Sequence, residues 1–185
     1  MPACPAAPCT LPLVHPDLPY GYSEWMAFTN AQQTTLGHLH PVNWLYAQAA
    51  PGVYFPFFVV ELKAAAGTGG TLWDAANQCA GGAAACLQAL DQLNTALGAA
   101  GGQGRIPNLC YSLAIDNNLG QLYAWWKDGS TFHIQRVASY LLSDAQHFAR
   151  LCACVAAILE WGATARLRDI RLAVDYIGGQ RLGQK

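Results

Sequence analysis

The feature that most constrains the fold is an apolar run that ends in two opposite charges. Residues 54–63 read YFPFFVVELK, in a chain of which only 11% is charged. A run rich in Val and Phe is typical of a strand buried on both faces. Because side chains alternate along a strand, Phe57, Val59, Glu61 and Lys63 are expected to share one face. The two charges then emerge together where the strand leaves the core.

A long helix is predicted directly after this strand. A Gly-rich loop, 67–70, separates the strand from apolar residues that keep helical spacing over 72–97, and Thr71 can cap the helix. Gly81 and Gly82 lie in its middle, where each costs about 1 kcal/mol relative to Ala. We expect a second backbone to lie close against the helix at this pair.

The remaining sequence predicts a single domain of mixed α/β class over residues 17–182. Residues 1–16 are Pro-rich and predicted to form an irregular arm, and 16–23 (PDLPYGYS) are predicted to be turn-like. The other predicted elements are a helix within 28–40 capped by Thr29 or Asn30, strands at 109–115, 119–127 and 131–137, and helices at 144–161 and 164–177.

Composition limits the classes of function. The formal net charge is −1, which argues against a high-affinity, nonspecific DNA-binding protein but leaves room for a local basic cleft. No uninterrupted apolar run approaches the roughly 20 residues of a membrane span, so no membrane association is expected. The number of Cys, seven, is odd, and four of them (Cys79, Cys86, Cys152 and Cys154) lie in apolar, helical segments. Both features favour a reduced, intracellular protein of the nucleus or cytoplasm. With so few charges, apolar surfaces make a homodimer possible.

The strand end suits metal-assisted hydrolysis. Glu61 can be a ligand of Mg²⁺ or Mn²⁺, and Lys63 can orient or deprotonate an attacking water or neutralise developing negative charge. The structural alternative is a salt bridge between the two side chains. Pro16-Asp17 supplies a second carboxylate upstream, and Gln78 lies within the first two turns of the following helix, from which it can point back at the strand end.

The chain resembles the PD-(D/E)XK nuclease superfamily in the order of three features. These are Pro16-Asp17, then Glu61-Leu62-Lys63, then a helix that carries Gln78. The resemblance implies a restriction-endonuclease-like fold, in which a central mixed sheet is flanked by helices. It implies that Asp17 and Glu61 bind one or two Mg²⁺ or Mn²⁺ ions, that Lys63 serves the nucleophilic water, and that Gln78 supports the site.

A longer resemblance spans about Asp17 to Arg171. Four segments resemble an uncharacterised domain family that is frequent in fungal proteomes and is itself similar to PD-(D/E)XK nucleases. They are PDLPYGYS, FPFFVVELKAAAGTGGTLWDAANQCAGGAAAC, YAWWKD and ILEWGATARLRDIR. Relative to the superfamily the chain is N-terminally shortened, and residues 18–60 form a long insert. The implied function is hydrolysis of DNA or RNA, with an inert module for protein or nucleic-acid binding as the alternative.

Four further side chains are weaker candidates for nucleic-acid contacts. Trp126, next to Trp125, could stack on an unpaired base, although packing in the core is the commoner role of such a residue. Arg166, Arg168 and Arg171 form the densest basic cluster and could contact phosphates, or could simply line a solvated helix face. The loop 67–70 before the helix could likewise contact a phosphate through its backbone, or serve only as a flexible connection.

Overall fold

The computed structural model describes residues 16–39, 48–50, 52–63 and 70–182. The predicted arm at 1–15 and most of the Gly-rich loop therefore lie outside the described residues. The elements are β1 (Leu18–Ser23), α1 (Glu24–Ala27), α2 (Asn30–Leu39), β2 (Gln48–Ala50), β3 (Val53–Leu62), α4 (Leu72–Ala99), β4 (Leu109–Ile115), β5 (Leu119–Asp128), β6 (Thr131–Leu141), α5 (Ala145–Trp161), a π-helical turn (Gly162–Arg166) and α6 (Leu167–Leu182).

These strands form one mixed sheet with the order β1-β3-β4-β5-β6, and β2 pairs with β3 outside this path. Only β3 and β4 are parallel, because the crossover helix α4 returns the chain to the same end of the sheet. All other neighbours are antiparallel. The fold is therefore a mixed α/β fold with a central mixed sheet flanked by helices, as the sequence predicts.

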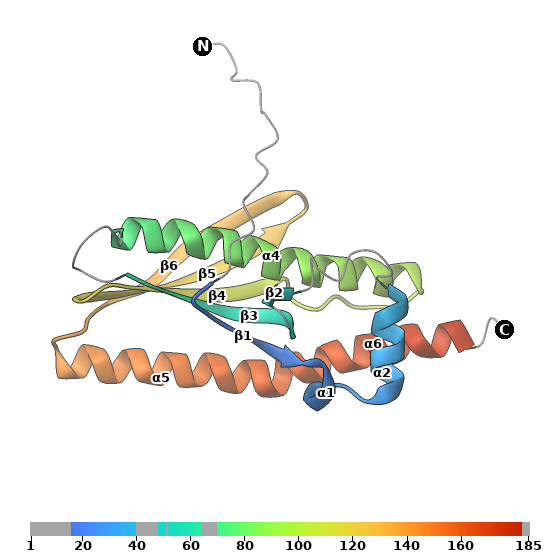
Figure 1. The fold of residues 1–185 in the computed structure, drawn as a ribbon. Helices are drawn as coiled ribbons and strands as arrows, with labels where there is room; N and C mark the ends of the chain where they lie inside the picture. Colours follow the sequence, from blue (N-terminus) through green and yellow to red (C-terminus); the bar gives the residue numbers. More distant parts are fainter. Residues whose placement is uncertain (1–15, 40–47, 51, 64–69, 183–185) are drawn as a thin grey trace, which may run out of the picture.

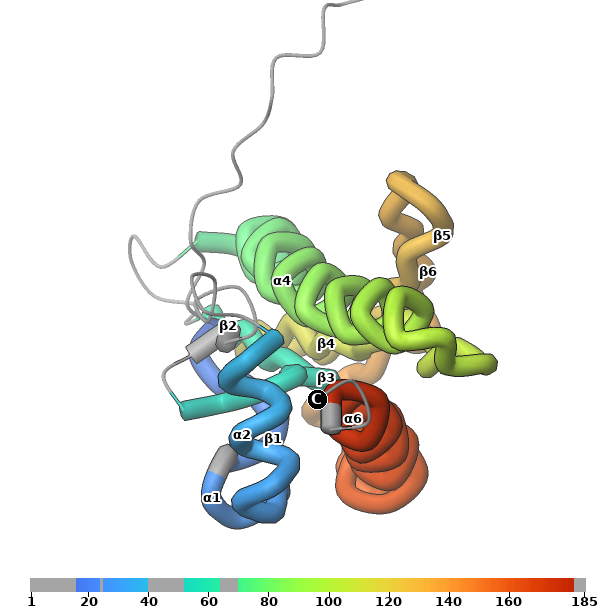
Figure 2. The backbone as a smooth tube through the Cα atoms, turned by 90° about the vertical axis from the view of Figure 1, so that its right-hand side faces the viewer, coloured from blue at the N-terminus to red at the C-terminus, as the bar shows by residue number. Residues whose placement is uncertain are grey.

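Two helical layers cover the sheet. In Figure 1, α4 crosses one face, and the continuous helical stretch of α5, the π-helical turn and α6 crosses the other. Figure 2 views the molecule from one end and shows α2 and α6 next to each other, and the two helices are in contact. The side chain of Gln32 on α2 donates hydrogen bonds to both carboxylate oxygens of Asp175 on α6, at 2.9 and 3.0 Å.

Helix α4 packs closely on the sheet because its inner face consists of small residues. Ala75, Cys79 and Ala83 are fully buried, together with Val59 of β3. Thr71 and Asp74 form a capping box at the start of the helix. At Gly82 the expectation of a close backbone is wrong: a Cβ added there would meet the side chain of Val59, at an ordinary contact distance of 3.4 Å.

The segment 16–23 is not the predicted turn. Residues Leu18–Ser23 form β1, which pairs antiparallel with β3 at the edge of the sheet. Pro and Gly usually mark turns, but an edge strand tolerates Pro19, and a shift in register between Tyr20 and Tyr22 accommodates Gly21. A Cβ on Gly21 would lie 2.8 Å from the carbonyl oxygen of Tyr54, so the close approach of β3 requires glycine.

Strand β3 does not keep the predicted alternation at Phe57. Val59 lies against Gly82 of α4, whereas the ring of Phe57 packs edge-on against Trp161 of α5 and stacks on Tyr22. The irregularity begins two residues earlier, since Phe55 has a positive φ of 44° and Pro56 follows it. Beyond this point β3 and β4 remain in regular parallel register as far as Leu62.

The two predicted C-terminal helices form one continuous helical stretch, because the π-helical turn joins them without a break. By length and hydropathy alone, the segment Ala145–Arg181 is apolar enough to cross a membrane, and 17% of its most apolar window is buried in the fold. Core helices of water-soluble proteins pass the same test, so this finding is weak evidence. The predicted lack of membrane association stays a prediction.

Candidate functional site

The antiparallel pairing of β1 with β3 brings Asp17 and Glu61 together. Leu18 lies opposite Val60 in the ladder, so the same register places Asp17 opposite Glu61. Asp17 is exposed, and its Oδ2 accepts a hydrogen bond of 2.8 Å from the backbone N–H of Leu62. Two residues that are 44 positions apart in sequence thus become neighbours at the edge of the sheet.

Glu61 occupies a costly environment for a carboxylate. It is only 2% exposed, and its Oε1 has no hydrogen-bond partner among the described residues. Burial is the largest cause that raises the pKa of this carboxyl, the charge and hydrogen bond of Asp17 add to it, and Lys63 opposes them, so that the pKa lies at about 7. A group kept only to stabilise the fold would be expected to have a partner for that oxygen.

Lys63 follows β3 and is half-buried. Its backbone N–H donates to the carbonyl of Ile115 at 2.8 Å, which extends the β3–β4 pairing past the last strand residue. Among the described residues no ion pair joins Lys63 to Glu61, so the alternative of a structural salt bridge is not what the structure contains. The ammonium group nevertheless limits the rise in the pKa of Glu61. The hydrogen bonds of Thr71 are the main cause that lowers the pKa of Asp74, and the charge of Lys63 adds to it.

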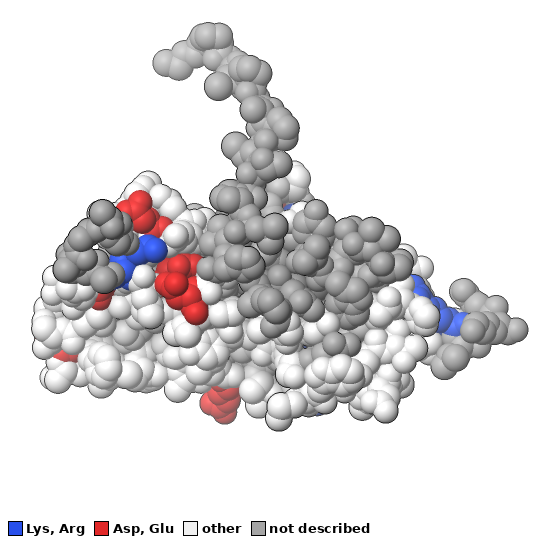
Figure 3. Space-filling model, in the orientation of Figure 1, with Lys and Arg blue, Asp and Glu red and all other residues white. Residues whose placement is uncertain are grey.

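Asp74 is a charged neighbour that sequence reasoning missed. Its Oδ2 accepts hydrogen bonds from the backbone N–H of Thr71 at 2.6 Å and from the Thr71 hydroxyl at 2.9 Å. The pattern Thr-x-x-Asp before an apolar run is a capping-box signal, so the sequence could have revealed it. Figure 3 shows acidic and basic side chains gathered at one end of a face that otherwise carries little charge.

The buried residues that lie near Glu61 were also not recognised as part of the site from the sequence. Cys79 of α4 and Ser112 of β4 are fully buried there, and the Trp125 indole N–H donates to the Ser112 hydroxyl at 2.8 Å. Burial raises the pKa of the Cys79 thiol to about 12, and the nearby charges of Glu61 and Asp17 add to the effect. This thiol is therefore protonated, and it contributes packing rather than a reactive thiolate.

Gln78 lies in the N-terminal part of α4 and is not among the residues of this helix that pack in the core. Gln78 is exposed, and no hydrogen bond in the described structure joins it to Asp17, Glu61 or Lys63. The supporting role of Gln78 stays a prediction, because no hydrogen bond among the described residues fixes it to the site.

Asp17 and Glu61 are the residues that could hold a metal ion. Within the described ranges no group of three or more His, Cys, Asp or Glu side chains is arranged to bind one. Mg²⁺ commonly takes only one or two protein carboxylates and retains several waters. The unpartnered Glu61 oxygen beside the exposed Asp17 carboxylate fits this kind of site.

The three arginines do not form one basic surface. Arg166 is 2% exposed and donates hydrogen bonds to the carbonyls of Leu109 and Pro56, at 3.0 and 3.4 Å, so in this fold it is removed from phosphate contacts. The exposed Arg168 pairs with its neighbour Asp169. Arg171 donates to the carbonyl of Ala27 at 2.7 Å. The helical spacing in the sequence placed Arg166 on a different side of the helix from Arg168 and Arg171, but it did not indicate that Arg166 is buried.

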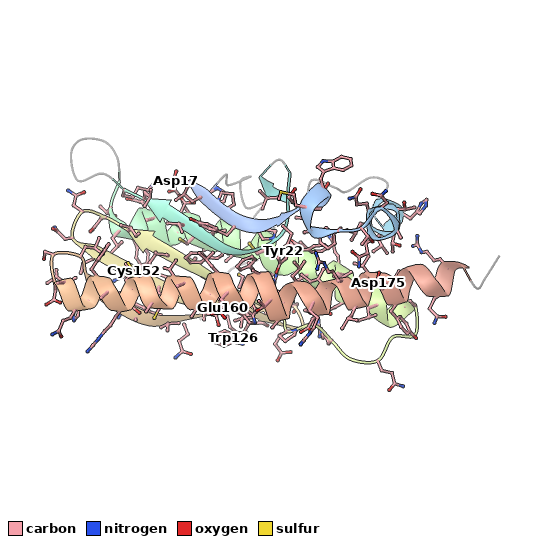
Figure 4. The ribbon with its side chains drawn as sticks, turned by 90° about the horizontal axis from the view of Figure 1, so that it is seen from below. Asp17, Tyr22, Trp126, Cys152, Glu160 and Asp175 are labelled. Atoms are coloured by element: carbon pink, nitrogen blue, oxygen red, sulfur yellow. The ribbon has the colours of Figure 1, made fainter. Side chains whose placement is uncertain are left out.

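Trp126 is 36% exposed, and its ring is stacked on His133 with 5.2 Å between the ring centroids. In the sheet register Trp126 lies opposite Leu109, whereas Glu61 lies beside Ala114. Five residues along β4 separate these positions, or about 17 Å. Figure 4 shows Asp17 and Trp126 on opposite sides of α5 in this view, so Trp126 is not part of the site at Glu61.

Comparison with known families matches residues 2–174 to a family described as a domain of unknown function (DUF7924). The match covers most of the chain, which belongs to this family. No curated protein and no solved structure matches the chain.

Proposed function

We propose that the protein is a metal-dependent phosphodiesterase that hydrolyses DNA or RNA, with a site resembling those of PD-(D/E)XK nucleases. The observation that supports this proposal most is the environment of Glu61. Its carboxylate is buried beside a second carboxylate, has an unpartnered oxygen, and is not paired with the lysine two residues later. Natural proteins retain such unfavourable arrangements chiefly at functional sites.

The residues would divide the chemistry as follows. Asp17 and Glu61 would hold Mg²⁺ or Mn²⁺, which when bound supplies a Lewis acid and a more acidic water. Lys63 extends from the same strand end, where its ammonium group would orient the attacking water or stabilise negative charge that develops on the phosphate. Asp74, at the start of α4, lies near enough for its carboxylate and the ammonium group of Lys63 to attract each other.

A binding module without catalysis is the second candidate, and two observations favour it. Gln78 makes no hydrogen bond to the other site residues in the described structure, and the described residues contain no cluster of three metal-binding side chains. A protein that kept the fold but lost the chemistry would show both features. It would also have no reason to retain Glu61 in an environment that destabilises its charge.

Cleavage of plasmid DNA, single-stranded DNA and RNA in Mg²⁺, Mn²⁺ or EDTA tests the proposal. The wild type is compared with Glu61→Gln, Asp17→Asn and Lys63→Met, which preserve the approximate shape of each side chain. Glu160 is exposed on α5, so Glu160→Gln repeats the same chemical change away from the site. We expect metal-dependent cleavage by the wild type and Glu160→Gln, and a loss of at least 100-fold in the three site variants.

Equal cleavage by the wild type and the folded Glu61→Gln variant would reject the assignment of the site. An absence of cleavage on every substrate, together with metal binding that depends on Glu61, would favour the binding module. Circular dichroism and thermal unfolding of each variant separate loss of chemistry from loss of fold.

A further inference from the structure

The outer edge of β6 is an open strand edge, separate from the site at Glu61. In the described sheet β6 pairs only with β5, so the backbone groups on its other side have no partner strand. At its C-terminal end the N–H of Leu141 is satisfied by Nδ1 of His147 at 3.1 Å. The open part of the edge therefore lies before that residue.

This edge lacks most of the features that usually prevent strands from pairing between molecules. Residues Thr131–Leu141 include no proline and no acidic residue. Arg136 is the only side chain among them that is always charged, and His133 can carry a charge when protonated. Phe132, Ile134 and Val137 are 44%, 51% and 53% exposed. An exposed, apolar edge strand of this length is a ready template for another strand.

A bulge limits the part of β6 that can pair regularly. Tyr123 lies opposite Arg136 and Leu122 lies opposite Ala138, so Val137 is an extra residue between them. The regular segment is Thr131–Arg136. Within it, Ile134 and Arg136 lie opposite Trp125 and Tyr123, which are part of the cluster beneath α4. Phe132, Ile134 and Arg136 therefore share the α4 face of the sheet.

We propose that this segment pairs antiparallel with the same segment of a second copy of the chain, with the two-fold axis at Ile134. Such an axis, perpendicular to the sheet, keeps each face on its own side, so even-numbered positions must lie opposite even-numbered positions. Of the possible centres, Phe132 and Gln135 would each pair only three residues of the regular segment. Arg136 would place two like charges opposite each other, and His133 would leave Arg136 without a partner within the segment. Ile134 avoids these problems.

Centred on Ile134, the pairing is complementary along its whole length. The two Ile134 side chains meet at the axis, and each Phe132 lies opposite Arg136 of the partner subunit, where guanidinium and ring attract each other. On the other face, His133 lies opposite Gln135 of the partner subunit. The backbone supplies the remaining affinity, as it does when a peptide adds a strand to a sheet edge.

The interface is expected to be weak. Five residue pairs bury less than the roughly 800 Å² per partner of a standard interface, so we expect a dissociation constant of about 1 µM or weaker. Sedimentation velocity from about 1 to 300 µM should show a monomer that converts to a dimer. Ile134→Lys places two like charges across the axis and should weaken the dimer at least tenfold. The control Leu172→Lys, on exposed α6, should leave it unchanged.

Cysteine cross-linking tests the register, in a background that lacks Cys4, Cys9 and the exposed Cys152. Ile134→Cys brings two Cβ atoms to about 4.5–5.5 Å and should form an intermolecular disulfide under mild oxidation. In this register the two cysteines of a Phe132→Cys dimer lie four residues, or about 13 Å, apart along the strands, so no disulfide should form between them. A monomer at 300 µM, a dimer insensitive to Ile134→Lys, or cross-linking at Phe132 rather than Ile134 would each overturn the proposal.

Discussion

Two buried charges lie at opposite ends of the same sheet, and their surroundings differ. Arg166 is held between the rings of Phe57 and Trp161 and donates to two backbone carbonyls, so that only its Nε lacks a partner. Glu61 is equally buried but has a second carboxylate as its neighbour and an unpartnered oxygen. The first charge joins secondary-structure elements, whereas the second is costly in the free protein and would, in the proposed function, bind a cation.

Substitution of Arg166 should have the largest effect on stability. Arg166→Ala leaves the carbonyls of Leu109 and Pro56 unpaired and opens a cavity beneath the π-helical turn, which should cost about 3–5 kcal/mol. Urea denaturation measures the loss. Arg168→Ala, at an exposed position with a neighbouring ion pair, should change stability by less than about 0.5 kcal/mol. A similar small change in Arg166→Ala would remove the structural role assigned to this residue.

Substitution of Glu61 should have the opposite sign. In metal-free protein at pH 8, Glu61→Gln removes a buried negative charge and should increase the free energy of unfolding. The raised pKa corresponds to at most about 3 kcal/mol, and screening by solvent at the exposed Asp17 reduces the expected gain to about 1–2 kcal/mol. Denaturation in EDTA tests this. A Glu61→Gln variant less stable than the wild type would mean that Glu61 supports the fold.

The gain should depend on pH in a defined direction. The folded-state pKa of Glu61, about 7, lies above its ordinary value of 4.5, so the folded protein holds this proton more tightly than the unfolded chain. Glu61 therefore lowers stability progressively between about pH 4.5 and 7, and the loss is complete above that window. The stability difference between Glu61→Gln and the wild type should be near zero at pH 4.5 and maximal at pH 8. A difference that does not vary over this window would contradict the origin assigned to it.

Asp17→Asn should produce the smallest change and sharpen the account of the pair. The asparagine side chain can still accept the hydrogen bond from Leu62, while the charge beside Glu61 disappears. The pKa of Glu61 should fall toward its ordinary value without reaching it, because burial is the larger cause. Carboxyl-carbon NMR titration follows this directly. An unchanged pKa would show that the two carboxylates do not interact.

The sequence predicted the fold well where the pattern was periodic. The buried strand β3, the capped helix α4 and the β4–β5–β6 meander all follow from alternation, helical spacing and turn residues. It failed at β1, where Pro19 and Gly21 indicated a turn, because pairing with β3 outweighed local preference. The continuity of α5 and α6 was missed because a π-helical turn has no comparable sequence signal.

The candidate site divides in the same way. Alternation along β3 predicted that Glu61 and Lys63 emerge together, and the resemblance to PD-(D/E)XK nucleases indicated Asp17. Neither could reveal that Glu61 lacks an ion pair or that Arg166 is buried, because both facts depend on contacts between residues distant in sequence. Burial of an arginine by aromatic rings and carbonyls leaves no local pattern.

Calorimetric titration of Mn²⁺ into the wild type, Glu61→Gln and the control Glu160→Gln tests the central claim most directly. We expect the wild type and Glu160→Gln to bind the ion equally and Glu61→Gln to bind it at least tenfold more weakly. This weaker binding is expected even though Glu61→Gln should be the more stable protein without metal. Equal binding by Glu61→Gln, or no binding by the folded wild type, would contradict the assignment of Asp17 and Glu61 as a metal site.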